Sequence, residues 1–265
     1  MSSPATLAIC TVPVLPMREG PSQGSEMVSE LIFGECYEIV RTQAGNWHRV
    51  RSGEDGYEGW SLVRHPAWVE ESLFHTTGEP LAGDWVNEVE LDGQSFMVPL
   101  GSRLKGLGEE GARWGNIHLT YHGRQIPAAD QAPDQDRIRA IATQFLNSSY
   151  LWGGKTVFGL DCSGFTQSVY RLIGTRISRD ASQQYGEGEQ LPASQQPCCG
   201  DLAFFNQGSG KPTHVGIILE PGRIIHCSEK VRVDALDSMG IRLSETGELT
   251  HRLVGICRYF RLREC

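Results

Sequence analysis

A single cysteine stands where a glycine-containing turn runs into an amphipathic helix. Asp161 precedes it as an N-cap, and Cys162, Ser163 and Gly164 fill the first turn. The apolar stripe of the expected helix consists of Phe165, Val169, Leu172 and Ile173. Free N–H groups and the positive end of the helix dipole favour a thiolate at such a position. The pattern therefore predicts a nucleophilic cysteine, with a buried structural thiol as the alternative.

Two histidines far along the chain are candidate partners of this thiol. His214 lies 52 residues after Cys162 and begins an apolar run, and His226 lies 12 residues further on, at the end of a second run. A hairpin between the two runs would bring the histidines together. A cysteine nucleophile, a histidine base and a polar group that orients the base are the minimum set for thiol acyl transfer. The alternatives are a solvent-facing strand end for His214 and a half-buried strand residue for His226.

Helices followed by strands indicate the fold class of the C-terminal half. Asp134 is expected to cap a helix that runs to Ser148, and a second helix covers 162–173 with Gly174 at its C′ position. Apolar runs at 202–205, 215–219, 224–227, 231–233 and 253–260 alternate with Gly, Pro and charged turns. Such runs are typical of an antiparallel sheet. The order predicts an α+β domain.

The N-terminal half has the alternation and turn spacing of small β-barrels. The segments 45–50 (Gly-Asn-Trp-His-Arg-Val) and 55–60 (Asp-Gly-Tyr-Glu-Gly-Trp) resemble bacterial SH3-like domains. Residues 66–130 repeat the unit in degraded form, at 96–101 and 113–119. We therefore expect an SH3-like barrel over 1–65, a second, divergent barrel over 66–130, and a C-terminal domain over 131–265. Pro127 to Pro133 forms a linker-like seam between the last two.

Composition limits the classes of partner. The net charge of −8 over 265 residues disfavours nucleic acid and anionic membranes. The eight cysteines show no zinc-like spacing, so we expect reduced thiols and neither a metal nor another cofactor. Residues 1–8 lack the basic and apolar segments of a signal peptide, and no run of 18 apolar residues occurs. We expect a soluble, cytoplasmic protein without an obligate protein partner.

Five motifs of the C-terminal half together resemble the NlpC-type papain-like cysteine peptidases. They are 150–155 with 159–165, 179–184, 200–205, the strand that begins at His214, and 224–226. The match covers about residues 134–260. With the SH3-like region, the chain is most similar to the γ-D-glutamyl-L-diamino acid endopeptidases of cell-wall recycling, the dipeptidyl-peptidase VI type. This resemblance implies a papain-like catalytic domain preceded by one or two small SH3-like barrels.

The resemblance also implies catalytic roles. Cys162 would attack the γ-linked amide of D-glutamate, and His214 would take the thiol proton and later protonate the leaving amine. His226 would orient His214. The Tyr150 hydroxyl and the backbone N–H of the nucleophile would form the oxyanion hole. Tyr150 has an alternative role as a core aromatic at the end of the first helix.

Further residues match the substrate pocket of this branch. Acidic and hydroxyl groups beside the nucleophile hold the free L-alanine amine there, and Asp161 and Ser163 match them. Asp161 has a competing explanation as a plain helix cap. Trp152 and Asp180 also match pocket positions. Ordinary packing is the alternative for Trp152, and capping of a short helix at 181–185 is the alternative for Asp180.

The SH3-like domain of such enzymes contributes to the same pocket. Tyr57 is the candidate that closes its amine end, with a barrel-shaping residue as the alternative, and Glu26 is the candidate glutamate near the start of the domain. A buried carboxylate that pairs with an ammonium group is left unpaired when the amine is acylated. The pocket would therefore accept released peptides and reject the polymer.

The sequence thus predicts a cysteine endopeptidase that hydrolyses the γ-D-glutamyl-L-diamino acid bond of murein peptides with a free N-terminal L-alanine. Two alternatives remain at this stage. One is an exported peptidoglycan hydrolase that acts on intact cell wall. The other is a catalytically idle wall-binding module.

Overall fold

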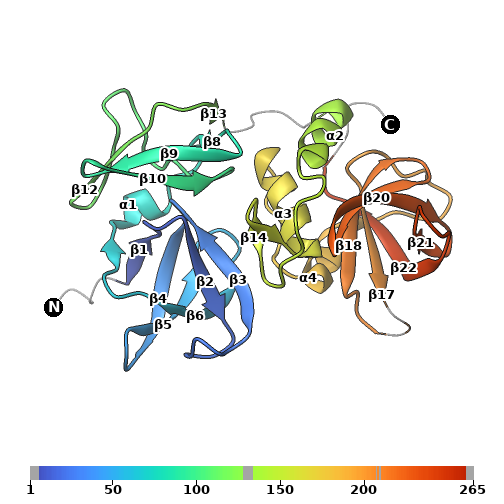
Figure 1. The fold of residues 1–265 in the computed structure, drawn as a ribbon, viewed down its shortest axis with the longest axis horizontal. Coiled ribbons are helices and arrows are strands. Elements are labelled where there is room, and N and C mark those ends of the chain that lie inside the picture. The colour runs from blue at the N-terminus through green and yellow to red at the C-terminus, as the bar shows by residue number, and fades with distance from the viewer. Residues whose placement is uncertain (1–5, 128–133, 207, 209, 261–265) are drawn as a thin grey trace. The chain divides into compact units, whose positions relative to one another are not determined.

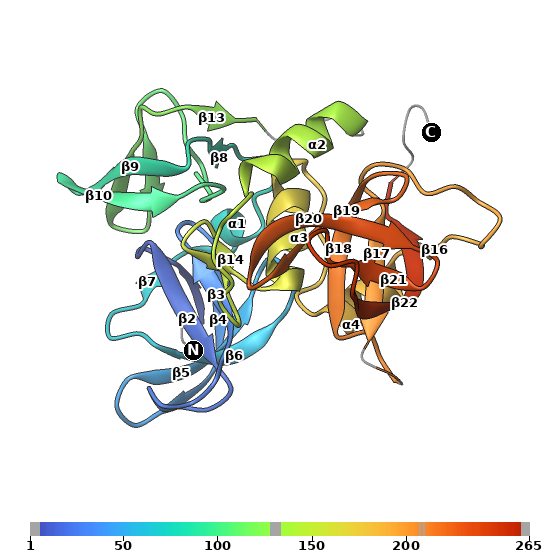
Figure 2. The same cartoon turned by 45° about the vertical axis from the view of Figure 1, so that its right-hand side comes forward.

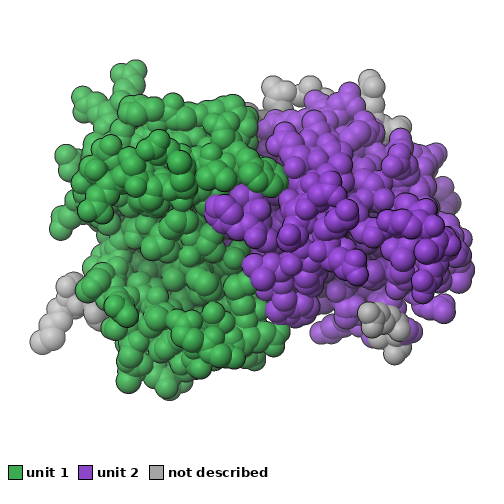
Figure 3. Space-filling model, in the orientation of Figure 1, with its two compact units in different colours: residues 1–128 green, residues 129–265 purple. Residues whose placement is uncertain are grey.

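The chain divides into two compact units, residues 1–128 (unit 1) and 129–265 (unit 2), shown in Figure 3. The computed structural model describes residues 6–127, 134–206, 208 and 210–260. The expected linker, Pro127 apart, and the first five residues of the N-terminal segment lie outside the described residues.

Unit 1 consists of short antiparallel strands and one short helix, α1 (Glu71–Phe74). Seven strands form one sheet in the order β3-β2-β6-β5-β4-β1-β7, and four others form a second in the order β10-β9-β12-β11. The strands are β1 (Leu7–Ile9), β2 (Val14–Arg18), β3 (Met27–Ile32), β4 (Cys36–Gln43), β5 (Trp47–Ser52), β6 (Glu58–Leu62), β7 (Ala67–Trp68), β8 (Leu81–Ala82), β9 (Val86–Leu91), β10 (Gln94–Pro99), β11 (Ala112–Trp114), β12 (Ile117–Thr120) and β13 (Gln125–Ile126).

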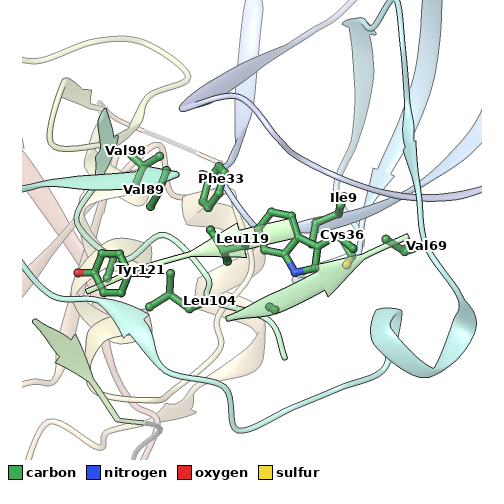
Figure 4. Packing of buried hydrophobic residues seen from close by; sticks show 12 residues of the cluster. Ile9, Phe33, Cys36, Val69, Val89, Val98, Leu104, Leu119 and Tyr121 are labelled. Atoms are coloured by element: carbon green, nitrogen blue, oxygen red, sulfur yellow. The ribbon is translucent and has the colours of Figure 1, made fainter. Parts of the chain in front are cut away.

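One buried cluster connects the two sheets of unit 1. Phe33, which follows β3, packs on Trp114 of β11 with ring centroids 5.1 Å apart. Val89 and Leu119 of the second sheet and Ile9 of the first belong to the same cluster (Figure 4). The two expected barrels therefore share apolar core in this unit. The boundary at residue 65 between them stays a prediction.

Unit 2 begins with helices that follow the expected capping pattern. Asp134 caps α2 (Gln135–Gln144) by accepting the N–H of Arg137 at 2.7 Å. Helix α3 (Cys162–Leu172) is followed by Gly174 with φ of +82°, the conformation of a C′ glycine. Helix α4 (Ala181–Glu187) starts after Asp180. Figures 1 and 2 both show α2 and α3 on the same side of the sheet of unit 2.

Six antiparallel strands of unit 2 close on themselves. They run in the order β22-β17-β18-β19-β20-β21, and β21 pairs again with β22, while β16 extends the edge of β22. A small hairpin, β14–β15, precedes α3. The strands are β14 (Lys155–Thr156), β15 (Gly159–Leu160), β16 (Glu189–Gln190), β17 (Leu202–Asn206), β18 (His214–Glu220), β19 (Arg223–Ser228), β20 (Lys230–Asp237), β21 (Gly240–Arg242) and β22 (Leu249–Arg258).

Two expectations about unit 2 need correction. The first helix ends at Gln144 rather than Ser148, because Asn147 adopts a φ of +67° and donates its N–H to the carbonyl of Val231. The thiols are not all reduced, because Cys198 is disulfide-bonded. The other described cysteines are free.

Candidate active site

The start of α3 is built around Cys162. Asp161 caps the helix by accepting the N–H of Gly164 at 2.7 Å. A Cβ at position 164 would collide with the carbonyl oxygen of Gly154, so only glycine fits under this turn. The Asp-Cys-Ser-Gly pattern thus fixes the helix start and leaves Cys162 on its first turn.

The thiol faces the beginning of strand β18. Its Sγ atom lies 3.9 Å from the carbonyl oxygen of Thr213, and the backbone N–H of Val215 hydrogen-bonds to the same sulfur. His214 is the residue between these two contacts. Cys162 is therefore placed against the backbone that carries the expected base.

The charge state of this thiol differs from the expectation. Burial and the neighbouring Asp161 carboxylate raise the pKa of Cys162 to about 12, although backbone N–H groups and Arg179 oppose the rise. The helix start alone does not produce a thiolate, because the side chain is only 8% exposed. The resting sulfur is a thiol, and it needs a base to become a nucleophile.

The structure brings His214 and His226 together. Gly216 of β18 pairs with His226 of β19, and His214 is the diagonal neighbour of His226 on the same face. A Cβ at Gly216 would lie 2.7 Å from that of His226, so the glycine makes room for the imidazole. Nε2 of His214 lies 2.9 Å from Nδ1 of His226. Burial, then His226 and His251, lower the pKa of His214 well below 6.5.

A buried carboxylate continues this line of side chains and was missed in the sequence. Asp234 of β20 lies with Oδ2 at 3.0 Å from Nε2 of His226, and it accepts hydrogen bonds from Arg232 at 2.6 Å and from Ser244. Burial raises the pKa of Asp234, but the hydrogen bonds from His226 and Arg232 outweigh this and hold it well below its usual range. The signal was the alternation Val231-Arg232-Val233-Asp234, which places two polar side chains on one face of a strand.

A third imidazole was also missed. His251 of β22 stacks on His214 with ring centroids 4.2 Å apart and an interplanar angle of 26°. Its Nδ1 atom lies 2.9 Å from Oγ1 of Thr250. Burial and the neighbouring His226 lower the pKa of His251 to about 4, so the ring is neutral near neutral pH. The sequence distance between His251 and Cys162 gave no indication of this contact.

Asp161 makes more contacts than a plain helix cap. Its carboxylate forms an ion pair with Arg179 at 2.5 Å and accepts the N–H of Gly153 at 2.9 Å. Ser163 donates to the same carboxylate at 3.3 Å and accepts from Arg179 at 2.9 Å. The side chains of Asp161 and Arg179 are 9% and 1% exposed. The expected carboxylate therefore already has a cation as its partner.

The other expected residues of unit 2 lie around the same helix start. Tyr150 is half-buried, and burial, then Cys162 and Asp161, raise the pKa of its hydroxyl, so this group lies near the thiol. Trp152, in the turn before β14, is 59% exposed. Asp180 precedes α4, and its backbone N–H donates to the Gln183 side chain at 3.1 Å.

Two expected residues belong to unit 1. Tyr57 lies just before β6 and lines a cavity of about 240 Å³ together with Arg18, Arg49 and Trp60. Glu26 is exposed just before β3. Their contribution to the site stays a prediction.

Within the part of the chain that the structure describes, no group of three or more His, Cys, Asp or Glu side chains could hold a metal ion. None of the described helices has the length and apolar character needed to span a membrane.

Comparison with known proteins agrees with the geometry. Residues 147–247 match the NlpC/P60 family, and residues 17–63 match the bacterial dipeptidyl-peptidase Sh3 domain. The chain is 28% identical to the gamma-D-glutamyl-L-lysine dipeptidyl-peptidase of Bacillus subtilis over 75% of this chain and 71% of the relative. It is 24% identical to the dipeptidyl-peptidase 6 of Lysinibacillus sphaericus, over 82% and 87% of the two chains.

A solved structure shares the fold. The crystal structure of an NlpC/P60 family protein from Bacillus cereus superposes with a TM-score of 0.77 at 21% identity, over 97% of this chain and 100% of that one. Fold and family matches together define a cysteine peptidase with a papain-like α+β catalytic domain after an SH3-like region, and confirm the expected class. The chain carries an NlpC/P60-family domain together with a bacterial dipeptidyl-peptidase SH3 domain.

Proposed function

We propose that this cysteine peptidase hydrolyses the γ-D-glutamyl-L-diamino acid bond of murein peptides that carry a free N-terminal L-alanine. The observation that carries the proposal is the placement of Cys162 against the strand that begins with His214, with His226 within 2.9 Å of that imidazole. The relatives named gamma-D-glutamyl-L-lysine dipeptidyl-peptidase support the choice of bond.

The proposed reaction passes through a thioester. His214 takes the proton of the Cys162 thiol while the sulfur attacks the carbonyl carbon of the γ-amide. The tetrahedral intermediate then collapses, and the imidazolium gives its proton to the leaving amine of the diamino acid. His214 next removes a proton from a water molecule that attacks the thioester, and the thiol is regenerated. His226 keeps the ring of His214 in place through both steps.

The oxyanion of each intermediate requires preorganised donors. We assign this role to the backbone N–H of Cys162 and to the hydroxyl of Tyr150, whose raised pKa keeps it a donor. One such donor contributes about 3 kcal/mol to the stabilisation of a transition state.

The substrate segment on the acyl side carries both an ammonium group and a free α-carboxylate. The Asp161–Arg179 pair with Ser163 offers both signs of charge beside the thiol. We propose that this cluster, with Trp152 and Asp180, holds the segment. An acylated alanine has no ammonium group to pair with the carboxylate of this cluster, and the loss of such a polar contact discriminates by large factors.

The free amine is therefore expected to decide turnover. L-Ala-γ-D-Glu-L-lysine and L-Ala-γ-D-Glu-diaminopimelate should be cleaved at least about 10²-fold faster, by kcat/KM, than their N-acetylated forms. Product mass spectrometry measures both rates, with Cys162→Ser as the inactive control. Equal rates on both forms would refute the pocket assignment, and rapid solubilisation of purified sacculi would favour an exported wall hydrolase instead.

The proposal extends to recycling of wall peptides in the cytoplasm, since a free alanine amine exists on released peptides. Fractionation of cells with an antibody against the chain tests this location. Recovery with the periplasmic or culture fraction would contradict it.

A further inference from the structure

The buried carboxylate of Asp234 lies next to His226, on the strand two places away from β18, the strand that faces the thiol. His214 of β18, His226 of β19 and Asp234 of β20 form a diagonal line across three neighbouring strands. The distances along it are 2.9 Å between the imidazoles and 3.0 Å from His226 to Asp234. We infer that Asp234 is a positioning residue that fixes which nitrogen of His214 acts as the base.

The carboxylate determines which nitrogen of each imidazole along the line carries a proton. An ionised carboxylate only accepts hydrogen bonds, so Nε2 of His226 must carry the proton in the bond to Asp234. A neutral His226 then presents a bare Nδ1, which accepts the Nε2–H of His214. The bare Nδ1 of His214 remains as the site that can accept the thiol proton. The carboxylate thus determines the tautomer of a ring that it does not touch.

Asp234 is held in the form that this role requires. Arg232 donates to both of its oxygens, at 2.6 and 3.0 Å, and the Ser244 N–H donates to Oδ1 at 2.9 Å. The Asp234 side chain is fully buried, while Arg232 also pairs with Glu245 on the exposed side. An anion kept in this way also stabilises the imidazolium that forms when the thiol proton moves onto the line.

Titratable and charged side chains of neighbouring strands contact the line of His214, His226 and Asp234. The rings of His214 and His226 are contacted by His251 of β22, and His226 pairs directly across the sheet with Arg232 of β20. Among these, Asp234 is the anion in contact with an imidazole. Removal of the Asp234 charge therefore changes a direct hydrogen bond to His226 and not only the electrostatic potential at the imidazoles.

Asp234→Asn is the sharpest test, because it keeps the shape and alters the hydrogen bonding. Both oxygens of the carboxylate receive donors, but an amide has one oxygen and one NH₂ group. With the amide oxygen in the place of Oδ1, toward the Ser244 N–H and Nη2 of Arg232, the NH₂ group takes the place of Oδ2. There it loses the hydrogen bond from Nε of Arg232 and requires a bare Nε2 on His226. His226 then carries its proton on Nδ1, and His214 presents an N–H to the thiol.

The control is Asp201→Asn. Asp201 is a buried aspartate of the same unit, paired with Arg258 at 2.7 Å, and it caps the N–H of Cys198 without a contact to the imidazoles. Both variants lose one charge of a buried Asp–Arg pair, so any purely structural cost is matched. Thermal melting and circular dichroism check that each variant folds.

Three readouts on the full chain test the role. We expect Asp234→Asn to lower kcat for the murein tripeptide by roughly 10²-fold, with a much smaller change in KM. Alkylation of Cys162 by iodoacetamide at neutral pH should slow by about tenfold, because the thiol loses its base. Nitrogen-15 shifts of the imidazoles should show that the protonated nitrogen of His214 changes from Nε2 to Nδ1.

The outcomes separate this inference from the proposed function on which its kinetic part rests. If no murein peptide is cleaved but alkylation and imidazole shifts change as expected, the substrate assignment fails and the role of Asp234 stands. If the shifts and the alkylation rate of folded Asp234→Asn equal those of Asp201→Asn, Asp234 is only structural. If Asp234→Asn does not fold, Arg232→Gln, which leaves the carboxylate in place, should retain the tautomer, and a changed tautomer there would overturn the inference.

Discussion

Cys162→Ala is expected to lower kcat/KM for the murein tripeptide by at least ~10⁴-fold. The sulfur is the one nucleophile in the proposed reaction, and a methyl group cannot form the thioester. The loss of one largely buried sulfur should change the free energy of unfolding by only about 1 kcal/mol. Activity and urea denaturation are measured on the same preparation, so that the chemical loss is separated from any loss of fold.

Cys199→Ala is the matched control for this substitution. Cys199 is a free cysteine of unit 2, 1% exposed, and its thiol donates to the carbonyl of Gln135 at 3.4 Å, away from the imidazoles. This variant should keep the turnover of the wild type. Turnover by folded Cys162→Ala within tenfold of wild type would show that another group carries the chemistry.

Arg179→Met is expected to cost unit 2 about 3–5 kcal/mol of unfolding free energy, because it leaves the buried Asp161 carboxylate without its cation. The same uncompensated charge stands next to Cys162 and would oppose thiolate formation. We therefore also expect slower alkylation of Cys162 in this variant. Urea denaturation followed by circular dichroism, together with peptide mapping of the alkylated protein, measures both effects.

Arg223→Met provides the comparison with an exposed pair. Arg223 pairs with Glu220 at 3.5 Å, and the two side chains are 59% and 50% exposed. The loss of this pair should therefore cost no more than about 1 kcal/mol. The double variant Asp161→Asn with Arg179→Met removes both charges and should recover part of the lost stability. A cost of Arg179→Met equal to that of Arg223→Met would show that Asp161 does not depend on its partner.

Local patterns of the sequence were sufficient for most of the fold. The cap at Asp134, the helix start at Asp161 and the C′ glycine at 174 depend on neighbouring residues only, and each lies where it was expected. The apolar runs of the C-terminal half form antiparallel strands as expected. The closure of β21 onto β22 could not be predicted, because β21 has only three residues and its pairing with β22 depends on the register of the completed sheet.

The site was predictable where its residues belong to a local motif. Cys162 was predicted from its place at a helix start and the two histidines from the ends of apolar runs, and the register of β18 and β19 explains why the imidazoles meet. Asp234 and His251 were missed, since only the completed sheet brings them to that pair. The burial that raises the pKa of Cys162 was missed for the same reason. The helix start predicts the effect of the helix dipole on the thiol, but it does not show which residues cover the side chain.

The pH dependence of Cys162 alkylation tests most directly whether His214 is the base of this thiol. Iodoacetamide labelling of the wild type and of His214→Ala is followed by peptide mapping, and the other described free cysteines are at most 2% exposed, so they contribute little background. The folded-state pKa of His214 is lowered, so its neutral form persists below pH 6.5, and wild-type labelling should stay fast at neutral pH and decline only below that value. Burial raises the pKa of this thiol to about 12, and without the imidazole no base takes its proton, so His214→Ala should react only as the pH rises far into the alkaline range. Identical profiles for the two proteins would contradict the assignment of His214 as the base.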